Sequence, residues 1–215
     1  MSAPEPKPRL RGVFHQWAFF VSLVAGGVLV ALAPTGRAAA VGGVYATALA
    51  GMFGASALYH RVAWRPSLRP WFRRLDHSMI YVLIAGTCTP VTVLGLEGVL
   101  PVVVLAVVWG GAIAGVVLKL VWLGAPRRLA AAVYVALGWV GVILLPEVVR
   151  SAGIVAAALF VGGGLLYTAG AIVYARRRPD PRPAVFGFHE VFHVFVVAAA
   201  AAHFVAIAVF VVSRG

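Results

Sequence analysis

The chain has 215 residues, of which 62% are hydrophobic and 11% are charged, and its formal net charge is +12. Soluble globular domains carry about 25% charged residues, so this composition excludes a soluble protein and indicates a multi-pass membrane protein. The single cysteine, Cys88, excludes an intramolecular disulfide and a cysteine-based metal site, and we expect it to be a small packing residue.

Seven apolar windows follow one another along the chain, each bounded by charged residues or by proline and glycine. A helix needs about 20 mostly apolar residues to cross the bilayer core. The windows are residues 15–33, 39–60, 76–95, 99–122, 128–146, 152–175 and 187–212. We therefore predict an all-α integral membrane protein, a seven-transmembrane helix bundle. A short basic, proline-rich tail at residues 1–14 precedes a single transmembrane domain at residues 15–215.

The tail MSAPEPKPRLRG is basic like the start of a signal peptide, but no A-x-A cleavage pattern follows it. We therefore expect the first span to be retained in the mature protein.

The basic residues between the predicted spans are distributed unevenly. With seven crossings, the N-terminal side holds all of the 18 Lys and Arg residues except Arg37, Arg150 and Arg214. By the positive-inside rule the N-terminus is cytoplasmic and the C-terminus is outside. We expect the basic loops to attract anionic lipid headgroups in a bacterial cytoplasmic (inner) membrane. No nucleic-acid-binding motif accompanies the charge, so we expect no nucleic acid partner.

Few ionisable side chains interrupt the predicted spans. Burying such a group in a bilayer costs a few kcal/mol, so each one is a candidate functional residue. On the predicted cytoplasmic side, one histidine ends the second span, Asp76 starts the third, and two histidines start the seventh. Three segments far apart in sequence thus bring imidazole and carboxylate groups to one depth. The full set is His60, Asp76, His77, His189, Glu190, His193 and His203.

The histidines favour a metal site. His189 and His193 are four residues apart, which places them on one helical face about 6 Å from each other. His60 would complete three protein ligands and leave a fourth position to water, the pattern of a catalytic zinc ion. Imidazole ligands favour zinc over calcium or magnesium and leave copper, nickel, iron and manganese open.

Two further residues fit a site of this kind. Asp76 either binds the metal directly or holds the metal-bound water from behind, where a carboxylate is placed to act as a general base. Ser56 lies four residues before His60 and so faces the same way. It can form a hydrogen bond at the site or contact a polarised substrate oxygen.

The same residues allow other interpretations. The pair His189 and His193 equally fits two polar residues at the membrane interface. With Glu190 they match the H-E-x-x-H motif of zinc proteases, but the usual third ligand of that class is absent from the chain.

For the remaining histidines and for three adjacent glycines we expect structural roles. His203 lies about 15 Å beyond His193 along the helix and is predicted to form a hydrogen bond within the bundle. His77 points about 100° away from Asp76, which favours an interfacial or supporting role. His15 is predicted to be interfacial, and Gly162–Gly164 to allow close helix contact.

Five segments resemble the successive motifs of a known family. They are SALYH at 56–60, LDHSMIYVLIAGTCTP at 75–90, YVALGWVGV at 134–142, GGGLLYTAGAIVYARRRP at 162–179 and HEVFHVFVVAAAAAHF at 189–204. In this order they resemble the hemolysin III family, the bacterial branch of the progestin and adipoQ receptor family, which includes the adiponectin receptors. The chain departs from the pattern at Cys88, where relatives usually carry tyrosine, and at Glu190, which varies.

The resemblance implies seven transmembrane helices with a cytoplasmic N-terminus. It also implies a zinc ion held by three histidines, which correspond to His60, His189 and His193. Asp76 corresponds to an aspartate that contacts the zinc-bound water, and Ser56 matches the family serine. Similar proteins include ceramidases, which hydrolyse the amide of a sphingolipid.

From these observations we expect a zinc-dependent intramembrane hydrolase of a lipid amide or ester. Asp76 would act as the base, and Ser56 would stabilise the developing oxyanion together with zinc. The alternative is a non-enzymatic receptor-like or membrane-lipid-regulating protein in which zinc is structural. A pore-forming hemolysin is a third hypothesis, and the absence of a polar stripe along the spans disfavours it.

Overall fold

The computed structural model of the chain describes residues 7–212. Residues 1–6 of the predicted tail, and residues 213–215 with Arg214, lie outside this part. The described part is helical and contains no β-strand. Its elements are α1 (Val13–Ala31), α2 (Gly36–Arg61), α3 (Arg69–Gly95), α4 (Leu100–Val121), α5 (Arg127–Trp139), the 3-10 helix η1 (Val140–Leu144), α6 (Leu145–Arg176) and α7 (Phe188–Val212).

Six helical stretches in the described part are long and apolar enough to cross a bilayer: α1, α2, α3, α4, the continuous stretch Arg127–Arg176, and α7. Many of their large apolar side chains are exposed, for example Val24, Val121 and Ile154. Such a surface is stable against lipid and not against water. The prediction of an all-α integral membrane protein is therefore confirmed.

The helical stretches number six where the sequence predicted seven spans. The difference lies at the predicted break between residues 146 and 152, because this segment is helical and joins two predicted spans. Pro146 lies in the first turn of α6, where a missing backbone N–H costs the helix nothing. Glu147 and Arg150 form an ion pair one turn apart, so their charges do not end the helix.

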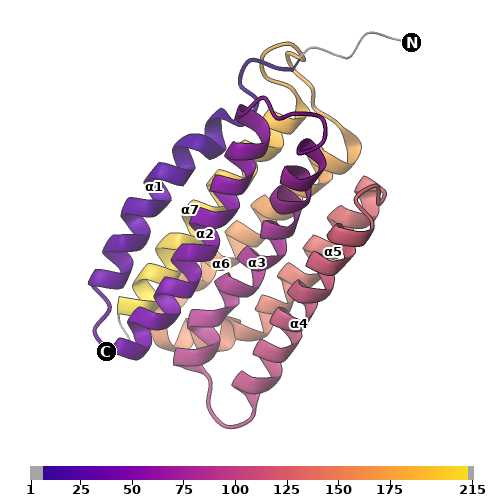
Figure 1. Cartoon of the computed structure of the whole chain (residues 1–215). Coiled ribbons are helices and arrows are strands. Elements are labelled where there is room, and N and C mark those ends of the chain that lie inside the picture. The colour runs from indigo at the N-terminus through magenta and orange to yellow at the C-terminus, as the bar shows by residue number, and fades with distance from the viewer. Residues whose placement is uncertain (1–6, 213–215) are drawn as a thin grey trace.

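The Arg127–Arg176 stretch is nevertheless not one straight rod. A straight helix would separate Arg127 from Tyr174 by about 70 Å, but the Arg127 guanidinium lies 5.7 Å from the centroid of the Tyr174 ring. Trp139 likewise donates a hydrogen bond from Nε1 to Thr168 Oγ1 at 3.1 Å. The chain folds back near Gly153, whose φ of 82° is outside the helical region and favours glycine. Figure 1 shows α5 and α6 side by side.

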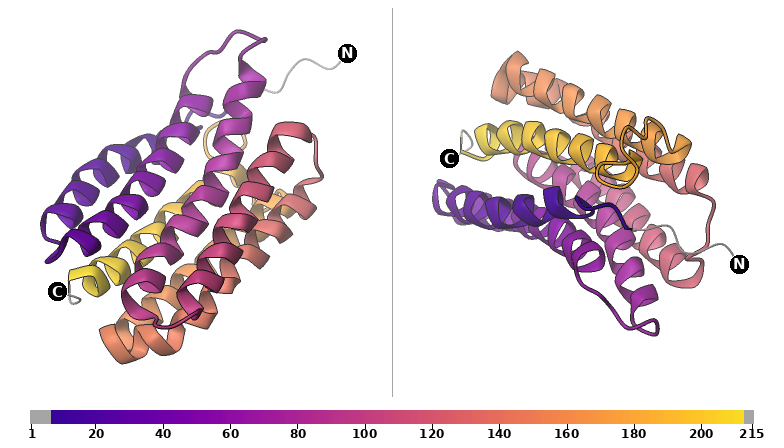
Figure 2. Two further views of the ribbon diagram at one scale, coloured as in Figure 1. Left: turned by 60° about the horizontal axis from the view of Figure 1, so that its bottom comes forward. Right: turned by 90° about the horizontal axis from the view of Figure 1, so that it is seen from above.

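Helix α7 occupies the middle of the bundle. It packs most extensively against α6 and also contacts α1, α2 and α3. Seen from above in Figure 2, α7 runs between the α1–α2 pair and α6. Side chains at one end of α7 can therefore meet residues from several helices at once.

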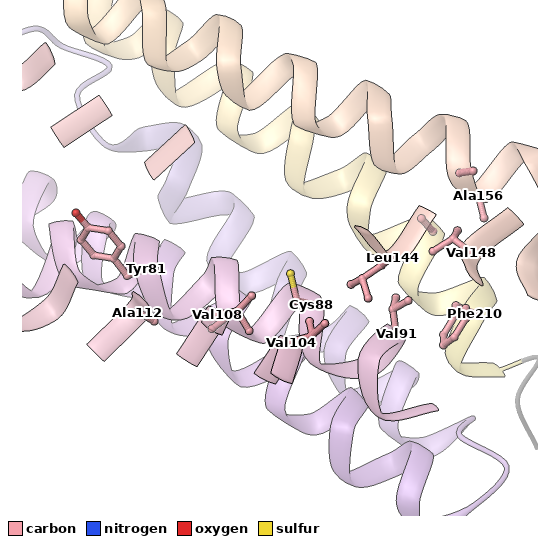
Figure 3. Close-up of a cluster of buried hydrophobic side chains, with 13 residues drawn as sticks. Tyr81, Cys88, Val91, Val104, Val108, Ala112, Leu144, Val148, Ala156 and Phe210 are labelled. Carbon is pink, nitrogen blue, oxygen red and sulfur yellow. The ribbon is translucent and has the colours of Figure 1, made fainter. Parts of the chain in front are cut away.

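Two apolar clusters hold the bundle together. One joins α1, α2, α3 and α7 around Tyr45 and Phe53. The other joins α3, α4, α6 and α7 and includes Cys88, Val91 and Phe210 (Figure 3). Cys88 is thus a buried packing residue, as predicted.

The three predicted contact glycines behave differently. A side chain at Gly163 would collide with the His203 ring, so α6 and α7 approach closely there. Gly162 has open space around it, and Gly164 has only the edge of Trp139 at 4.0 Å. The prediction is right for Gly163 and wrong for its two neighbours, because a helix presents only one residue in three or four to a given partner.

Candidate metal centre

Three histidines meet at one end of the bundle, where α2 ends and α7 begins. One ring nitrogen from each of His60, His189 and His193 lies within 4.8 Å of the other two, and the three residues form a group that could hold a metal ion. His60 Nε2 and His189 Nε2 are 3.1 Å apart. His60 and His193 are buried and His189 is partly buried. The spacing of His189 and His193 along α7 and the end of α2 at Arg61 produce this convergence.

The geometry of the three imidazoles fits a small cation. Two nitrogen ligands at about 2.05 Å from a tetrahedral zinc ion are about 3.3 Å apart, close to the distance between the two Nε2 atoms. His193 Nδ1 is also buried and has no hydrogen-bond partner among the described residues. The donor set, three neutral nitrogens without a thiolate, suits a borderline metal such as zinc.

Asp76 lies directly beside this group. Its Oδ2 atom is 3.7 Å from His60 Nε2 and 4.0 Å from His77 Nε2. The first distance is too long for a hydrogen bond and short enough for a group held between the two atoms. Asp76 is buried in the second turn of α3. His77, the next residue along α3, is partly buried.

Ser56 is also buried at the site, one turn before His60 on α2. Its hydroxyl lies within reach of the Asp76 carboxylate and is 2.8 Å from His15 Nδ1. All of the predicted site residues therefore lie in one region of the structure.

The structure adds His15 to this region, which sequence reasoning missed. The prediction that His15 is interfacial is wrong, because it is only 2% exposed. Its ring stacks on the His193 ring, with centroids 3.7 Å apart and an interplanar angle of 7°. This position depends on how α1 packs against α2 and α7, and no local pattern in the sequence marks it.

The Glu190 carboxylate is engaged by groups other than the three histidines. It forms an ion pair with Arg11 and accepts a hydrogen bond from the Gly187 backbone N–H at 2.9 Å. A carboxylate at the start of a helix stabilises the free N–H groups there. Glu190 thus fixes the start of α7 and holds the N-terminal segment in place. Its position gives no support to a zinc-protease role.

The N-terminal segment, residues 7–12, packs beside the candidate metal centre, against residues 184–185 and against His60. The backbone N–H groups of Arg9 and Leu10 donate to the carbonyls of Ala184 and Val185, each at 3.1 Å. Gly12 has a φ of 80°, and a Cβ atom there would lie 2.6 Å from His60 Cβ. The described part of the predicted tail is therefore packed against the bundle, and α1 already begins at Val13.

Positive charges from this segment and from nearby helices lie close together. Desolvation lowers the pKa of Lys7, and the nearby guanidinium groups of Arg61, Arg11 and Arg69 lower it further. The cytoplasm-facing end predicted from the loop charges is thus strongly basic beside the site.

His203 lies apart from the site. Its Nε2 donates to the Phe160 carbonyl at 3.0 Å, so the predicted hydrogen bond within the bundle is confirmed.

A cavity of about 190 Å³ opens onto the candidate metal centre. Ser56, Asp76, His189 and His193 line it at this end. It continues between α3 and the α5–α6 hairpin to apolar side chains such as Val148 and Phe160. The site is therefore connected to an apolar space inside the bundle.

Comparison with known proteins identifies the family to which the chain belongs. The family model described as "Haemolysin-III related" matches residues 5–204. A Hemolysin-3 homolog of Bacillus subtilis is 35% identical over 130 residues, which cover 60% of this chain and 58% of that relative. Hemolysin-3 of Bacillus cereus is 29% identical over 161 residues, which cover 75% of this chain and 70% of that relative. The match thus spans less than two thirds of the Bacillus subtilis protein.

A more distant relative comes from a plant. Heptahelical transmembrane protein ADIPOR2 of Oryza sativa subsp. japonica is 38% identical over 91 residues, which cover 38% of this chain and 40% of that relative. No solved structure matches the chain.

Proposed function

The chain belongs to the haemolysin-III-related family, and from this premise we propose that it is a zinc-dependent intramembrane hydrolase of a lipid amide or ester. Its six apolar helical stretches and its bacterial relatives make it a multi-pass protein of the bacterial cytoplasmic (inner) membrane. The observation that carries the proposal is the group of three histidines with Asp76 beside it at the mouth of an apolar cavity.

We further propose that the chain crosses the membrane seven times, with a cytoplasmic N-terminus and an outer C-terminus. The reversal near Gly153 supports two crossings within the Arg127–Arg176 stretch, one before Gly153 and one by the part of α6 that follows it. The basic loops then lie on the cytoplasmic side, in keeping with the positive-inside rule. In this arrangement residues 15–215 form a single transmembrane domain.

His60, His189 and His193 would hold the zinc ion. When bound there, zinc supplies a water molecule of lowered pKa and a positive charge for a substrate carbonyl. Asp76, whose Oδ2 atom is 3.7 Å from His60 Nε2, is placed to orient an attacking water molecule at the site and would accept its proton. The protonated Asp76 would then give this proton to the leaving oxygen or nitrogen of the substrate. The bond between the acyl carbon and the leaving atom is broken with the net addition of one water molecule.

Ser56 and His15 would assist from α2 and α1. The Ser56 hydroxyl can donate to the substrate carbonyl oxygen when His15 Nδ1–H donates to Ser56 Oγ. His15 would therefore be a positioning residue, held flat by its stacking on His193.

The proposal is tested by turnover in lipid. The purified chain in lipid nanodiscs is expected to release fatty acid from at least one member of a panel of lipid amides and esters, measured by mass spectrometry. Asp76→Asn should lower the rate at least about 100-fold, the usual contribution of a general base, and keep its metal. Glu97→Gln makes the same chemical change on an exposed loop and should leave the rate unaltered. Full turnover by Asp76→Asn would refute the mechanism.

A non-enzymatic protein with a structural zinc is the alternative. One observation favours it: the three histidines join α2 to α7, two helices that lie far apart in the sequence, so a bound ion would tie them together. Inertness toward every lipid class, together with a large loss of thermal stability on chelation, would support this role. The mostly apolar lining of the cavity gives no support to a pore.

A further inference from the structure

Three cationic side chains line the cavity beside the candidate metal centre. They are Arg73 on α3, Lys119 on α4 and Arg127 at the start of α5. All three act electrostatically on His77, and Arg73 also acts on the other two. Three helices therefore bring like charges to one place, which costs free energy unless an anion lies between them.

Among the described residues that line the cavity, Asp76 is the one carboxylate facing these cations, and it lies closest to the histidines. None of the three cations takes part in an ion pair within residues 7–212. Arg127 Nη1 is buried there without a hydrogen-bond partner. Lys119 Nζ faces the Tyr134 ring at 5.7 Å, and Arg127 faces Tyr174. Lys119 is buried and Arg73 and Arg127 are half-buried, and cations removed from water in this way normally have an anionic partner.

The charges are not explained by membrane orientation alone. Lysine and arginine near a membrane surface usually extend their charged ends into the headgroup region. Arg128 does so, since it is exposed. Lys119 is only 2% exposed and is directed into the cavity. The neighbouring pair Arg127 and Arg128 thus contains one cation inside the cavity and one outside it.

The rest of the cavity is apolar and long. Arg73 and Val91 both line it, and at a rise of about 1.5 Å per residue they lie about 27 Å apart along α3. This is close to the thickness of the hydrocarbon core, about 30 Å. At the far end the lining consists of side chains such as Leu144, Val148 and Phe160. A narrow apolar space with cations at one end matches an anionic headgroup attached to acyl chains.

We propose that the substrate is a lipid whose headgroup carries a phosphate, held by Arg73, Lys119 and Arg127 while its acyl chain fills the apolar part of the cavity. That this lipid is a substrate rests on the proposed hydrolase; that it binds does not. Asp76 lies 3.7 Å from His60 Nε2 and interacts electrostatically with Arg73, so it links the cations to the three histidines. A carbonyl a few bonds from the phosphate would therefore be next to the candidate metal centre. Hydrolysis would break its acyl bond, add one water molecule and release a fatty acid and a phosphate-bearing product.

Binding is measured by calorimetry on the full chain in detergent at low salt, with dioctanoyl phosphatidic acid and, as its uncharged counterpart, dioctanoylglycerol. We expect the phosphate-bearing lipid to bind at least about 10-fold more tightly, which corresponds to about 1.4 kcal/mol. Lys119→Gln and Arg127→Gln should each abolish this preference, and Arg128→Gln, the matched control, should keep it. Because two cavity variants are measured, the proposal is still tested if one of them fails to fold.

Equal binding of the two lipids by the wild type would overturn the proposal. So would an equal loss of preference in Arg128→Gln, because the effect would then come from surface charge. Inorganic phosphate is the third probe: if it binds as tightly as the phosphate-bearing lipid, the site is a free-anion site and the lipid assignment is wrong.

The outcomes separate this proposal from the proposed function. A preference for the phosphate-bearing lipid without any fatty acid release would retain the headgroup site and remove the hydrolase. Turnover of an uncharged lipid with no binding preference would retain the hydrolase and remove the headgroup site.

Discussion

Helix α7 carries histidines in two regions, and the two regions differ in what their rings contact. His203, in the middle of the helix, donates to one backbone carbonyl on α6 and packs against Gly163. His189 and His193, at the start of the helix, instead crowd against His60, and among residues 7–212 the buried Nδ1 of His193 has no hydrogen-bond partner. A histidine in an apolar span is thus compatible with a purely structural role. A functional role is indicated where several rings direct their nitrogens at one point.

The largest effect that separates the two regions is expected on metal removal. A ligand that binds only the folded state at 1,000 times its dissociation constant stabilises the protein by about 4 kcal/mol. A chelator should therefore lower the melting temperature of the wild type and of His203→Ala by the same amount. It should leave His189→Ala/His193→Ala unaffected. An equal shift in all three proteins would mean that the chelator acts elsewhere.

The second expected effect concerns the middle of α7. Gly163→Ala forces a methyl group against the His203 ring, and overpacking of this kind costs about 1–3 kcal/mol. Gly162→Ala adds the same methyl group where nothing lies within 4 Å, and it should be neutral or slightly stabilising. Thermal unfolding in one detergent compares the two. Similar melting temperatures would contradict the close approach of α6 and α7.

The third prediction distinguishes Glu190 from its histidine neighbours. Glu190→Gln removes a buried charge from its ion pair with Arg11 and should cost about 1–3 kcal/mol of stability. Arg11→Gln should cost a similar amount, and the double variant less than the sum of the two. Turnover should fall by less than about 3-fold, whereas loss of a general base would lower it at least about 100-fold. A loss of the latter size would revive the zinc-protease interpretation.

The smallest effect is expected at His15. His15→Phe keeps the ring stacked on His193 but removes the hydrogen bond to Ser56, which is worth about 1 kcal/mol and so about 5-fold in turnover. His15→Gln, which can restore a donor, should recover part of the rate, and both variants should keep their metal. Unchanged turnover in His15→Phe would remove the positioning role and leave His15 as a packing residue.

The sequence predicted the histidine site because two simple patterns fix it. A spacing of four residues places His189 and His193 on one face of α7, and the alternation of basic loops places His60 and Asp76 at the same end of the bundle. The apolar windows were equally informative about the helical, membrane-spanning fold. These features depend only on local periodicity and on the cost of burying charge in lipid.

The remaining features depend on tertiary packing. His15 reaches His193 only because α1 lies against α2 and α7. The helical continuation through Pro146 depends on where α6 starts. In the sequence, the charges of Glu147 and Arg150 suggested a loop, because their ion pair depends on the folded helix. Nothing in the sequence distinguishes three basic residues, Arg73, Lys119 and Arg127, from the other basic residues near the ends of the spans. Their position in the lining of a cavity follows from the packing of α3, α4 and α5.

The central claim is that His60, His189 and His193 bind a metal, and the most direct test is the metal content of the detergent-purified chain, measured by mass spectrometry without chelators. We predict about one zinc ion per chain in the wild type and in His203→Ala, and none in His189→Ala/His193→Ala. A folded wild type without bound metal, or a double variant that keeps its zinc, would contradict the account.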